Sequence, residues 1–214
     1  MAGEVDMLVR RYRSILSKLT EDGRAKVVSE LEAIDWSDVT RGANEAVEVM
    51  LRHCGQYTSQ AASTSTAMYE RLRRREVGEV LGAMAECGYD PDELEDDVRG
   101  MVNDVIAGKG EVFVSKCADR FEYEVRNAGK TCTERNMRRD PARPRYAVVP
   151  GGTCCTFCAM LASRGPVYSE SEHAESLHAH CGCVAVPTWN GKIEVEGYDQ
   201  EAYYQRYLDE VASK

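Results

Sequence analysis

The fold of the C-terminal third depends on residues 149–187, which read VPGGTCCTFCAMLASRGPVYSESEHAESLHAHCGCVAVP. Five of the nine cysteines and three of the four histidines in the chain fall within this segment. Cys155 and Cys158 form a C-x-x-C pair, and His178, Cys181 and Cys183 form an H-x-x-C-x-C group. Close-spaced cysteines and histidines of this kind are typical of a metal site, so the clustering predicts metal binding.

Zinc is the metal that this donor set predicts, because it takes four thiolate or imidazole ligands in a tetrahedron. The 19 residues between Cys158 and His178 form a loop close to the usual length in small zinc sites. A closed shell of four protein ligands leaves no position for water, so we expect a structural zinc. The competing interpretation is that the cysteines are buried thiols and the histidines are surface residues. The five candidate ligands are Cys155, Cys158, His178, Cys181 and Cys183. The last three of these compete for two positions in the metal shell. His180 and Cys154 are less favoured candidate ligands.

Enzyme motifs fit this segment poorly. Zinc nucleobase deaminases place H-x-E before P-C-x-x-C, whereas His173 and Glu175 follow the C-x-x-C pair and Pro150 is not adjacent to it. A nucleophile pair of Cys183 with His178 lacks an identifiable orienting residue. The phosphate-loop spacing is absent. We therefore expect no catalytic residues, no enzyme activity and no small-molecule substrate, with a metal-dependent hydrolase or deaminase as the least favoured reading.

Composition limits the remaining choices. The chain has 214 residues, of which 43% are hydrophobic, so a sizeable core can form. The formal net charge of −9 argues against wholesale nucleic-acid binding. No stretch approaches the roughly 20 apolar residues of a membrane span, and the N-terminus lacks the apolar run of a signal peptide. We therefore expect no membrane contact and synthesis in the cytoplasm of the producing cell.

Residues 1–145 read as a helical region. Apolar residues recur at steps of three and four, which predicts five to seven amphipathic helices before residue 130. Gly23 interrupts the first pattern, and residues 60–66 (QAASTST) fit either a loop or a helix packed closely on a neighbour. Pro91, preceded by Asp90 and followed by further acidic residues, is typical of a helix N-terminus.

Residues 146–214 read as a smaller region that contains β-structure. Short β-branched pieces at 146–149, 184–186 and 193–195 are punctuated by Gly and Pro, which predicts a small sheet. Residues 200–211 carry three tyrosines and predict a last helix that packs back on the metal loop or docks a partner. The fold class is therefore α+β: a largely helical N-terminal part and a small, zinc-stapled, β-containing C-terminal part.

An arginine-rich run, RNMRRDPARPR, occupies residues 135–145. It suits contact with DNA phosphates, and it equally suits a solvated linker balanced by the acidic segment 90–97.

A series of short motifs occurs in a fixed order in the second half of the chain. It comprises the run YAVVPGG from Tyr146, CTFC at 155–158, MLASRG at 160–165, VY at 167–168, HAHCGC at 178–183 and VP at 186–187, with Arg126, Thr131, Asn136 and Arg139-Asp140-Pro141 upstream. With these motifs the chain resembles the tailed-phage minor capsid (minor head) proteins, namely the Mu F-like or head-morphogenesis group of actinobacterial phages and prophages. The resemblance covers roughly residues 120–190, and Val149 departs from it, since many relatives have arginine directly before the following proline.

The resemblance implies a structural virion protein that acts in head assembly near the portal, inside the head, after synthesis in the host cytoplasm. It implies the portal and/or the major capsid protein as partners, with packaged DNA as a further contact. The histidine and cysteines of the motif look like a metal-binding staple in that group, which agrees with the ligands inferred above. A zinc-stabilised nucleic-acid-binding module is the alternative function.

Overall fold

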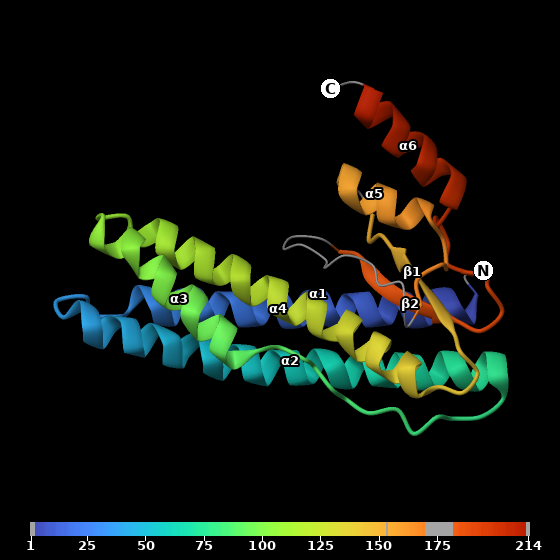
Figure 1. The fold of residues 1–214 in the computed structure, drawn as a ribbon, viewed down its shortest axis with the longest axis horizontal. Coiled ribbons are helices and arrows are strands. Elements are labelled where there is room, and N and C mark those ends of the chain that lie inside the picture. The colour runs from blue at the N-terminus through green and yellow to red at the C-terminus, as the bar shows by residue number, and fades with distance from the viewer. Residues whose placement is uncertain (1–2, 153, 170–181, 213–214) are drawn as a thin grey trace.

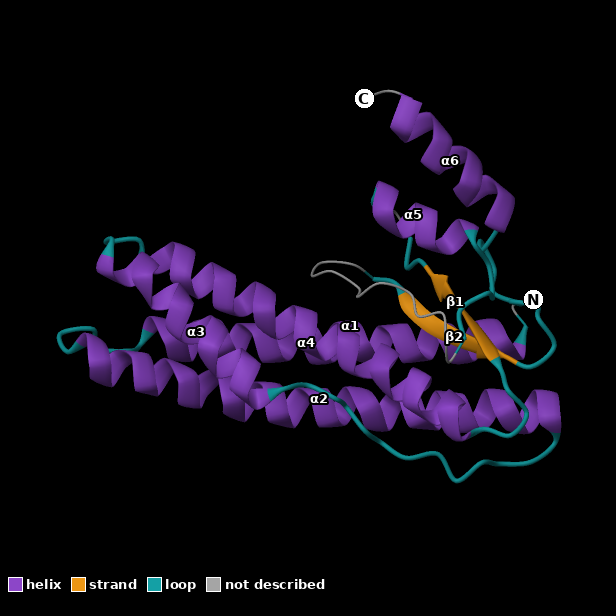
Figure 2. Cartoon of the chain, in the orientation of Figure 1, coloured by secondary structure: helices purple, strands orange, loops and turns teal. Residues whose placement is uncertain are grey.

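The computed structural model describes residues 3–152, 154–169 and 182–212. In this part of the chain there are six helices and a two-stranded sheet, which lies between the long helices and α5 (Figure 1, Figure 2). This arrangement confirms the α+β prediction in its broad form. The elements in chain order are α1 (Glu4–Glu32), α2 (Val39–Val77), α3 (Pro91–Ile106), α4 (Gly110–Arg139), β1 (Arg145–Val149), α5 (Thr156–Ser163), β2 (Val184–Thr188) and α6 (Gln200–Ala212).

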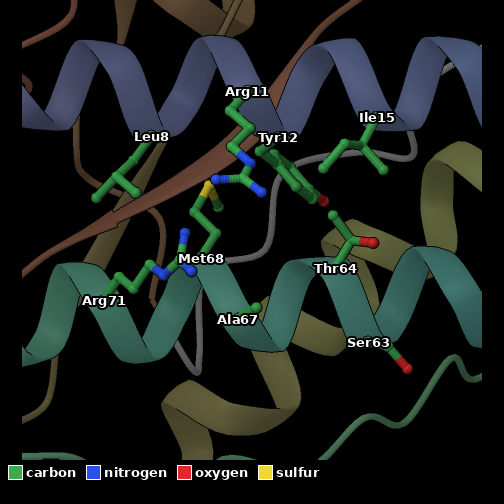
Figure 3. Close-up of a pocket in the computed structure, with 9 residues that line it drawn as sticks. All are labelled: Leu8, Arg11, Tyr12, Ile15, Ser63, Thr64, Ala67, Met68 and Arg71. Carbon is green, nitrogen blue, oxygen red and sulfur yellow. The ribbon is translucent and has the colours of Figure 1, made fainter.

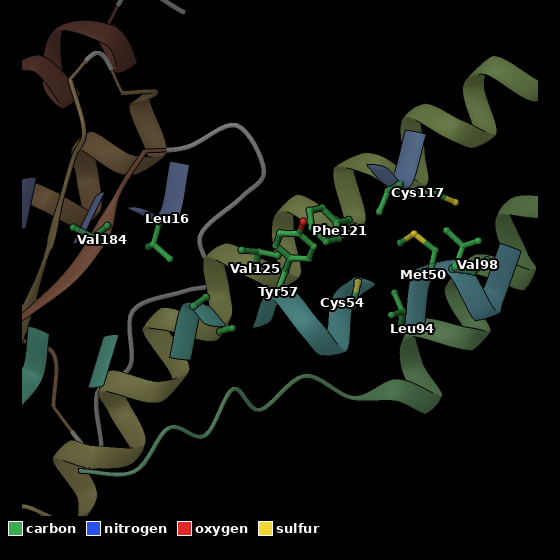
Figure 4. Packing of buried hydrophobic residues seen from close by; sticks show 14 of the residues in the cluster. Leu16, Met50, Cys54, Tyr57, Leu94, Val98, Cys117, Phe121, Val125 and Val184 are labelled. Atoms are coloured by element: carbon green, nitrogen blue, oxygen red, sulfur yellow. The ribbon is translucent and has the colours of Figure 1, made fainter. Parts of the chain in front are cut away.

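The three long helices α1, α2 and α4 pack against one another, and α3 covers one end of α2 and α4 (Figure 1). Tyr57 of α2 meets Phe121 of α4 edge-on, with 5.5 Å between the ring centroids. Figure 4 shows these rings beside Val125, and shows Leu94 of α3 packed towards Met50 of α2. Burial of such apolar side chains is the main force that stabilises the helical layers.

Helices α1 and α2 are longer than the sequence patterns predict. Four helices, rather than the five to seven predicted, begin before residue 130 in the described part of the chain. Gly23 lies inside α1 and is buried, because the ring of Phe121 occupies the space that a Cβ would fill. The missing side chain therefore permits close packing and does not end the helix.

The small residues at 60–66 form the close-packed helix that was one of the two expectations. Ser65 donates to the carbonyl oxygen of Gly129 on α4 at 2.8 Å. Ala61 and Ala62 are fully buried nearby. The outward hydroxyls of Ser63 and Thr64 donate to carbonyls four residues earlier, so they stay satisfied within the helix.

Helix α2 ends at Gly78, whose positive φ of 94° caps it. Residues 79–90 then return along α2 without regular structure (Figure 2). Glu70 accepts hydrogen bonds from the backbone of Leu81 and Ala83. Asn136 of α4 both accepts from and donates to the backbone of Met84, at 2.8 and 2.9 Å. The segment ends at Asp90, which caps α3, and the helix begins at Pro91 as the sequence predicts.

The two strands pair antiparallel, with Val149 opposite Val184 and Arg145 opposite Thr188. Successive side chains of a strand point to opposite faces, and both faces of this sheet are covered. Ala147, Val149, Val184 and Val186 join the core of the long helices, whereas Val148 and Ala185 join a second cluster with α5. The sheet is therefore an inner layer between the helical part and α5.

Two further predictions for the C-terminal part have different outcomes. Residues 193–195 form no strand, while α6 confirms the helix predicted for the tail. Helix α5 was not predicted. No described helix is both long enough and apolar enough to cross a membrane.

Replacement of Gly23 tests the close packing of α1 on α4. Gly23→Ala adds a methyl group that overlaps the Phe121 ring, and overpacking outweighs the gain in helix propensity. We expect the free energy of unfolding to fall by about 1 kcal/mol or more. The matched control is Gly100→Ala on the exposed surface of α3, where a Cβ meets nothing within 4 Å. That change should raise stability by up to about 1 kcal/mol. Urea denaturation measures the free energy of unfolding of both variants. Equal changes in the two variants would contradict the packing argument.

Candidate functional site

The paired strands bring the two halves of the cysteine-rich segment together. Because Val149 lies opposite Val184, the turn that follows β1 runs beside Gly182 and Cys183, which precede β2. A side chain at Gly151 would clash with the carbonyl oxygen of Gly182. The strand register therefore places Cys183 close to the segment that leads to Cys154.

The C-x-x-C pair lies at the N-terminus of α5. Cys155 is the N-cap residue, with an extended backbone, and its Sγ accepts from the backbone N–H of Cys158 at 3.5 Å. Cys155 is exposed, whereas Cys158 is fully buried. The short spacing thus puts one thiol at the surface and the other in the core.

Three cysteines share the cluster between the sheet and α5. Cys154, Cys158 and Cys183 are all buried there, beside Tyr146 and Tyr168. Two of the predicted ligands, Cys158 and Cys183, are therefore members of one cluster, which suits donors of a shared metal ion.

The other predicted ligands are placed less fully. His178 and Cys181 lie outside the described residues, as do His173, Glu175 and His180. Within the described ranges, no three His, Cys, Asp or Glu side chains are grouped to hold a metal ion. The metal site therefore stays a prediction, with Cys155, Cys158 and Cys183 as the predicted ligands that lie within the described residues.

Arg13 of α1 joins the helical part to the cysteine-rich turn. Its guanidinium donates to the carbonyl oxygens of Gly182 at 3.2 Å, Pro150 at 2.9 Å and Val149 at 3.3 Å. Burial lowers the pKa of Arg13 from its usual value. One side chain thus fixes both strand ends. The sequence signals no such role, because Arg13 lies among other arginines of an amphipathic helix.

Helix α6 closes the other side of the cluster. Arg206 donates to the carbonyl oxygen of Cys154, and its Nη1 lies 3.7 Å from the Cys154 Sγ. Glu210 pairs with Arg206 at 2.9 Å and accepts from the hydroxyl of Thr156. Tyr203 and Tyr207 pack against the cluster, as one of the two expectations for the tail tyrosines has it.

Asp140 is the buried charge that links the helical part to the region after β2. Its carboxylate accepts from Arg73 Nε at 2.9 Å, Tyr69 Oη at 3.0 Å and Trp189 Nε1 at 3.1 Å. Burial alone would raise the pKa of Asp140, but hydrogen bonds from Arg73, the backbone of Ala142, Tyr69 and Trp189 outweigh it and hold the pKa below its usual value. Asp140 belongs to the Arg-Asp-Pro motif, but nothing in the sequence around it indicates that its carboxylate is buried in this network.

The arginine-rich run is divided between α4 and the approach to β1. Arg135 and Arg139 extend from the last turns of α4 and pair with Glu86, at 3.5 and 2.5 Å. Arg145 donates to the carbonyl oxygen of Val167. The balancing carboxylate is therefore Glu86, while Glu93 and Asp97 of the acidic segment pair with Arg120.

Comparison with known proteins assigns the family. A family model described as VG15 protein matches residues 6–210, so the chain belongs to the VG15 protein family, which is a viral, phage-type family. The protein is therefore phage-related. The match extends through the helical layers as well as the cysteine-rich part. No curated protein and no solved structure matches the chain.

Removal of the Asp140 charge tests its structural role. Asp140→Asn leaves Arg73 buried without its carboxylate, and we expect a loss of about 3–5 kcal/mol near neutral pH. Because the folded-state pKa of Asp140 is depressed, its contribution is complete above the unfolded pKa of about 4 and disappears as the pH falls through the folded pKa. The loss of stability of Asp140→Asn relative to wild type should therefore become smaller at acid pH.

Urea denaturation of both proteins between neutral and acid pH measures this difference. Glu86→Gln is the control, because Glu86 is an accessible carboxylate whose pKa is also lowered by an arginine, here Arg139. Its removal should change stability little. A deficit for Asp140→Asn that stays constant down to about pH 2 would contradict the pKa argument.

Proposed function

We propose that this protein is a structural minor capsid protein of a tailed phage or prophage, of the Mu F-like head-morphogenesis type. It acts in head assembly near the portal, by binding and without catalysis. It is made in the host cytoplasm and resides inside the head of the virion. Its partners are the portal protein and/or the major capsid protein, and packaged DNA is a further contact.

Membership of the VG15 family over residues 6–210 is the observation that carries this proposal. The ordered motifs CTFC, LASRG and HAHCGC add the finer resemblance to minor head proteins. The described site also suits a structural role. Its charged groups, Arg13, Arg206 and Asp140, are used to join elements of the fold to one another.

We propose in addition that one zinc ion staples the C-terminal part, with four ligands drawn from Cys155, Cys158, His178, Cys181 and Cys183. Cys158 and Cys183 support this proposal because both are buried in one cluster beside the paired strands. Thiolates with imidazole are the donors that a closed zinc shell takes. When bound, the ion would cross-link the start of α5 to the segment before β2.

The zinc proposal predicts about one zinc per chain in protein purified without chelator, measured by inductively coupled plasma mass spectrometry. Cys158→Ser and Cys183→Ser should each abolish retention of zinc, because serine is a poor zinc ligand. Cys87→Ser is the matched control, since Cys87 is a half-buried cysteine outside the cluster. A chelator should lower the melting temperature of wild type and leave that of the Cys158 variant unchanged. Equal metal content in all four proteins would contradict the proposal.

The assembly proposal predicts that the chain co-purifies with its capsid partners. The tagged protein is co-expressed with the portal protein and, separately, with the major capsid protein of the same phage genome. We expect one or both to be retained, and a tail-tube protein from that genome to be lost. Mass spectrometry of purified virions should detect the chain in few copies. Its absence from virions, together with retention of neither capsid partner, would overturn the proposal.

A further inference from the structure

A shallow hollow lies between the N-terminal half of α1 and the C-terminal half of α2. Figure 3 shows its lining, and its volume is about 270 Å³. Leu8 and Ile15 of α1 and Ala67 and Met68 of α2 make it largely apolar, and Arg11 and Arg71 stand at its rim, one on each helix. The hollow therefore combines an apolar floor with two cationic side chains.

The two rim arginines lack the carboxylate partners that several arginines around them have. Arg10 pairs with Asp6 and Glu196, Arg73 with Asp140, and Arg75 with Glu194. Arg11 and Arg71 pair with no carboxylate in the described part of the chain, although both are exposed. Because Arg11 and Arg71 both line the hollow and neither has a carboxylate partner there, the hollow suits an occupant that brings its own negative charge together with apolar surface.

Helix α6 carries a surface of the complementary kind. Tyr204, Leu208 and Val211 are 45%, 39% and 49% exposed, and their spacing of four and three residues puts them on one face. Glu201 precedes Tyr204 by three residues and lies on the same face, exposed and outside any ion pair in the described structure. The opposite face of α6 is used internally, through Tyr203, Arg206 and Tyr207.

We propose that the exposed face of α6 from one copy of this chain docks in the α1–α2 hollow of a second copy. The apolar ridge of Tyr204, Leu208 and Val211 would cover Leu8, Ile15 and Met68, while Glu201 meets the rim arginines. A nucleic acid would supply phosphates to Arg11 and Arg71 but no apolar ridge. Glu201 beside the apolar ridge complements the cationic rim locally, so the helix offers both kinds of surface that the hollow presents.

The two surfaces lie on different elements, so the contact is heterologous: the helix of one copy enters the hollow of the next. Such a contact repeats until a ring closes or a chain grows, and it does not stop at a dimer. Each copy covers only a short helix face, so the interface belongs to the weak class below about 1,200 Å². Self-association is therefore expected at high protein concentration.

Sedimentation velocity of the full chain tests this inference at concentrations up to about 1 mM, as weak interfaces require. Wild type should form species larger than a dimer as concentration rises. Leu208→Asp places a charge in the middle of the apolar ridge. The double variant Arg11→Glu, Arg71→Glu reverses the charge at the rim of the hollow. Each should weaken association at least about tenfold, which corresponds to about 1.4 kcal/mol. The altered side chains are exposed, and circular dichroism checks that both variants fold.

The matched control for the rim is Arg41→Glu with Lys109→Glu, which changes the net charge equally at the other end of the helical layers. It should associate like wild type. Mixing the two deficient variants gives the decisive result, because the Leu208 variant keeps its hollow and the rim variant keeps its helix. The mixture should form a one-to-one dimer and nothing larger.

A wild-type chain that stays monomeric throughout would overturn the inference, as would a mixture that stays monomeric. Association that is lost equally in the charge-matched control would also overturn it, since general charge rather than the hollow would then be responsible. Binding of a short DNA duplex that is abolished by the rim variant, with no self-association of wild type, would assign the rim to nucleic acid instead.

Discussion

The carboxylate of Asp140 is fully buried, and its position holds several parts of the molecule in place. Arg73 and Tyr69 come from the last third of α2, Asp140 follows α4, and Trp189 follows β2. Removal of a charge from water is costly unless it is paired and hydrogen-bonded, so these elements must meet in one arrangement for the charge to be buried at all. The requirement fixes where α4 ends relative to α2 and where the chain leaves the sheet. The buried carboxylate therefore selects one arrangement of these elements, whatever the net contribution of Asp140 to stability.

The Asp140 network and the contacts of Arg13 also fix the position of the sheet against the helices. With only two strands it cannot stand alone in water, since isolated pairs of strands are marginally stable. Its alternating side chains are divided between the helical core and the cluster with α5, so each strand is buried on both faces. Glu76 of α2 adds a further link by accepting from the backbone of Trp189 and Asn190 at 2.8 and 3.1 Å. The C-terminal part is thus joined to the helices by buried polar contacts as well as by apolar packing.

The candidate site follows from these layers. The strand register brings Cys183 towards the segment of Cys154 to Cys158, and Arg13 and Arg206 bind the two sides of that segment. Both arginines act on backbone carbonyl oxygens, so the elements around the cysteines are positioned by groups other than the cysteines themselves. A metal staple would add a cross-link to a junction that already has a defined geometry.

Periodicity in the sequence was enough to predict the helical N-terminal part, the strands at 146–149 and 184–186, and the last helix, because those patterns depend on local burial. The start of α3 at Pro91 could also be predicted, because a proline followed by acidic residues is a local signal for a helix N-terminus. The cysteines and histidines could be identified as candidate ligands by spacing alone. Three features needed the tertiary structure: the continuity of α1 through Gly23, the bond network of Asp140, and the clamp of Arg13 on the cysteine-rich turn. Each depends on a partner that is distant in the chain (Phe121, Trp189 and Gly182, respectively), and a contact of that kind leaves no periodic trace in the residues that make it.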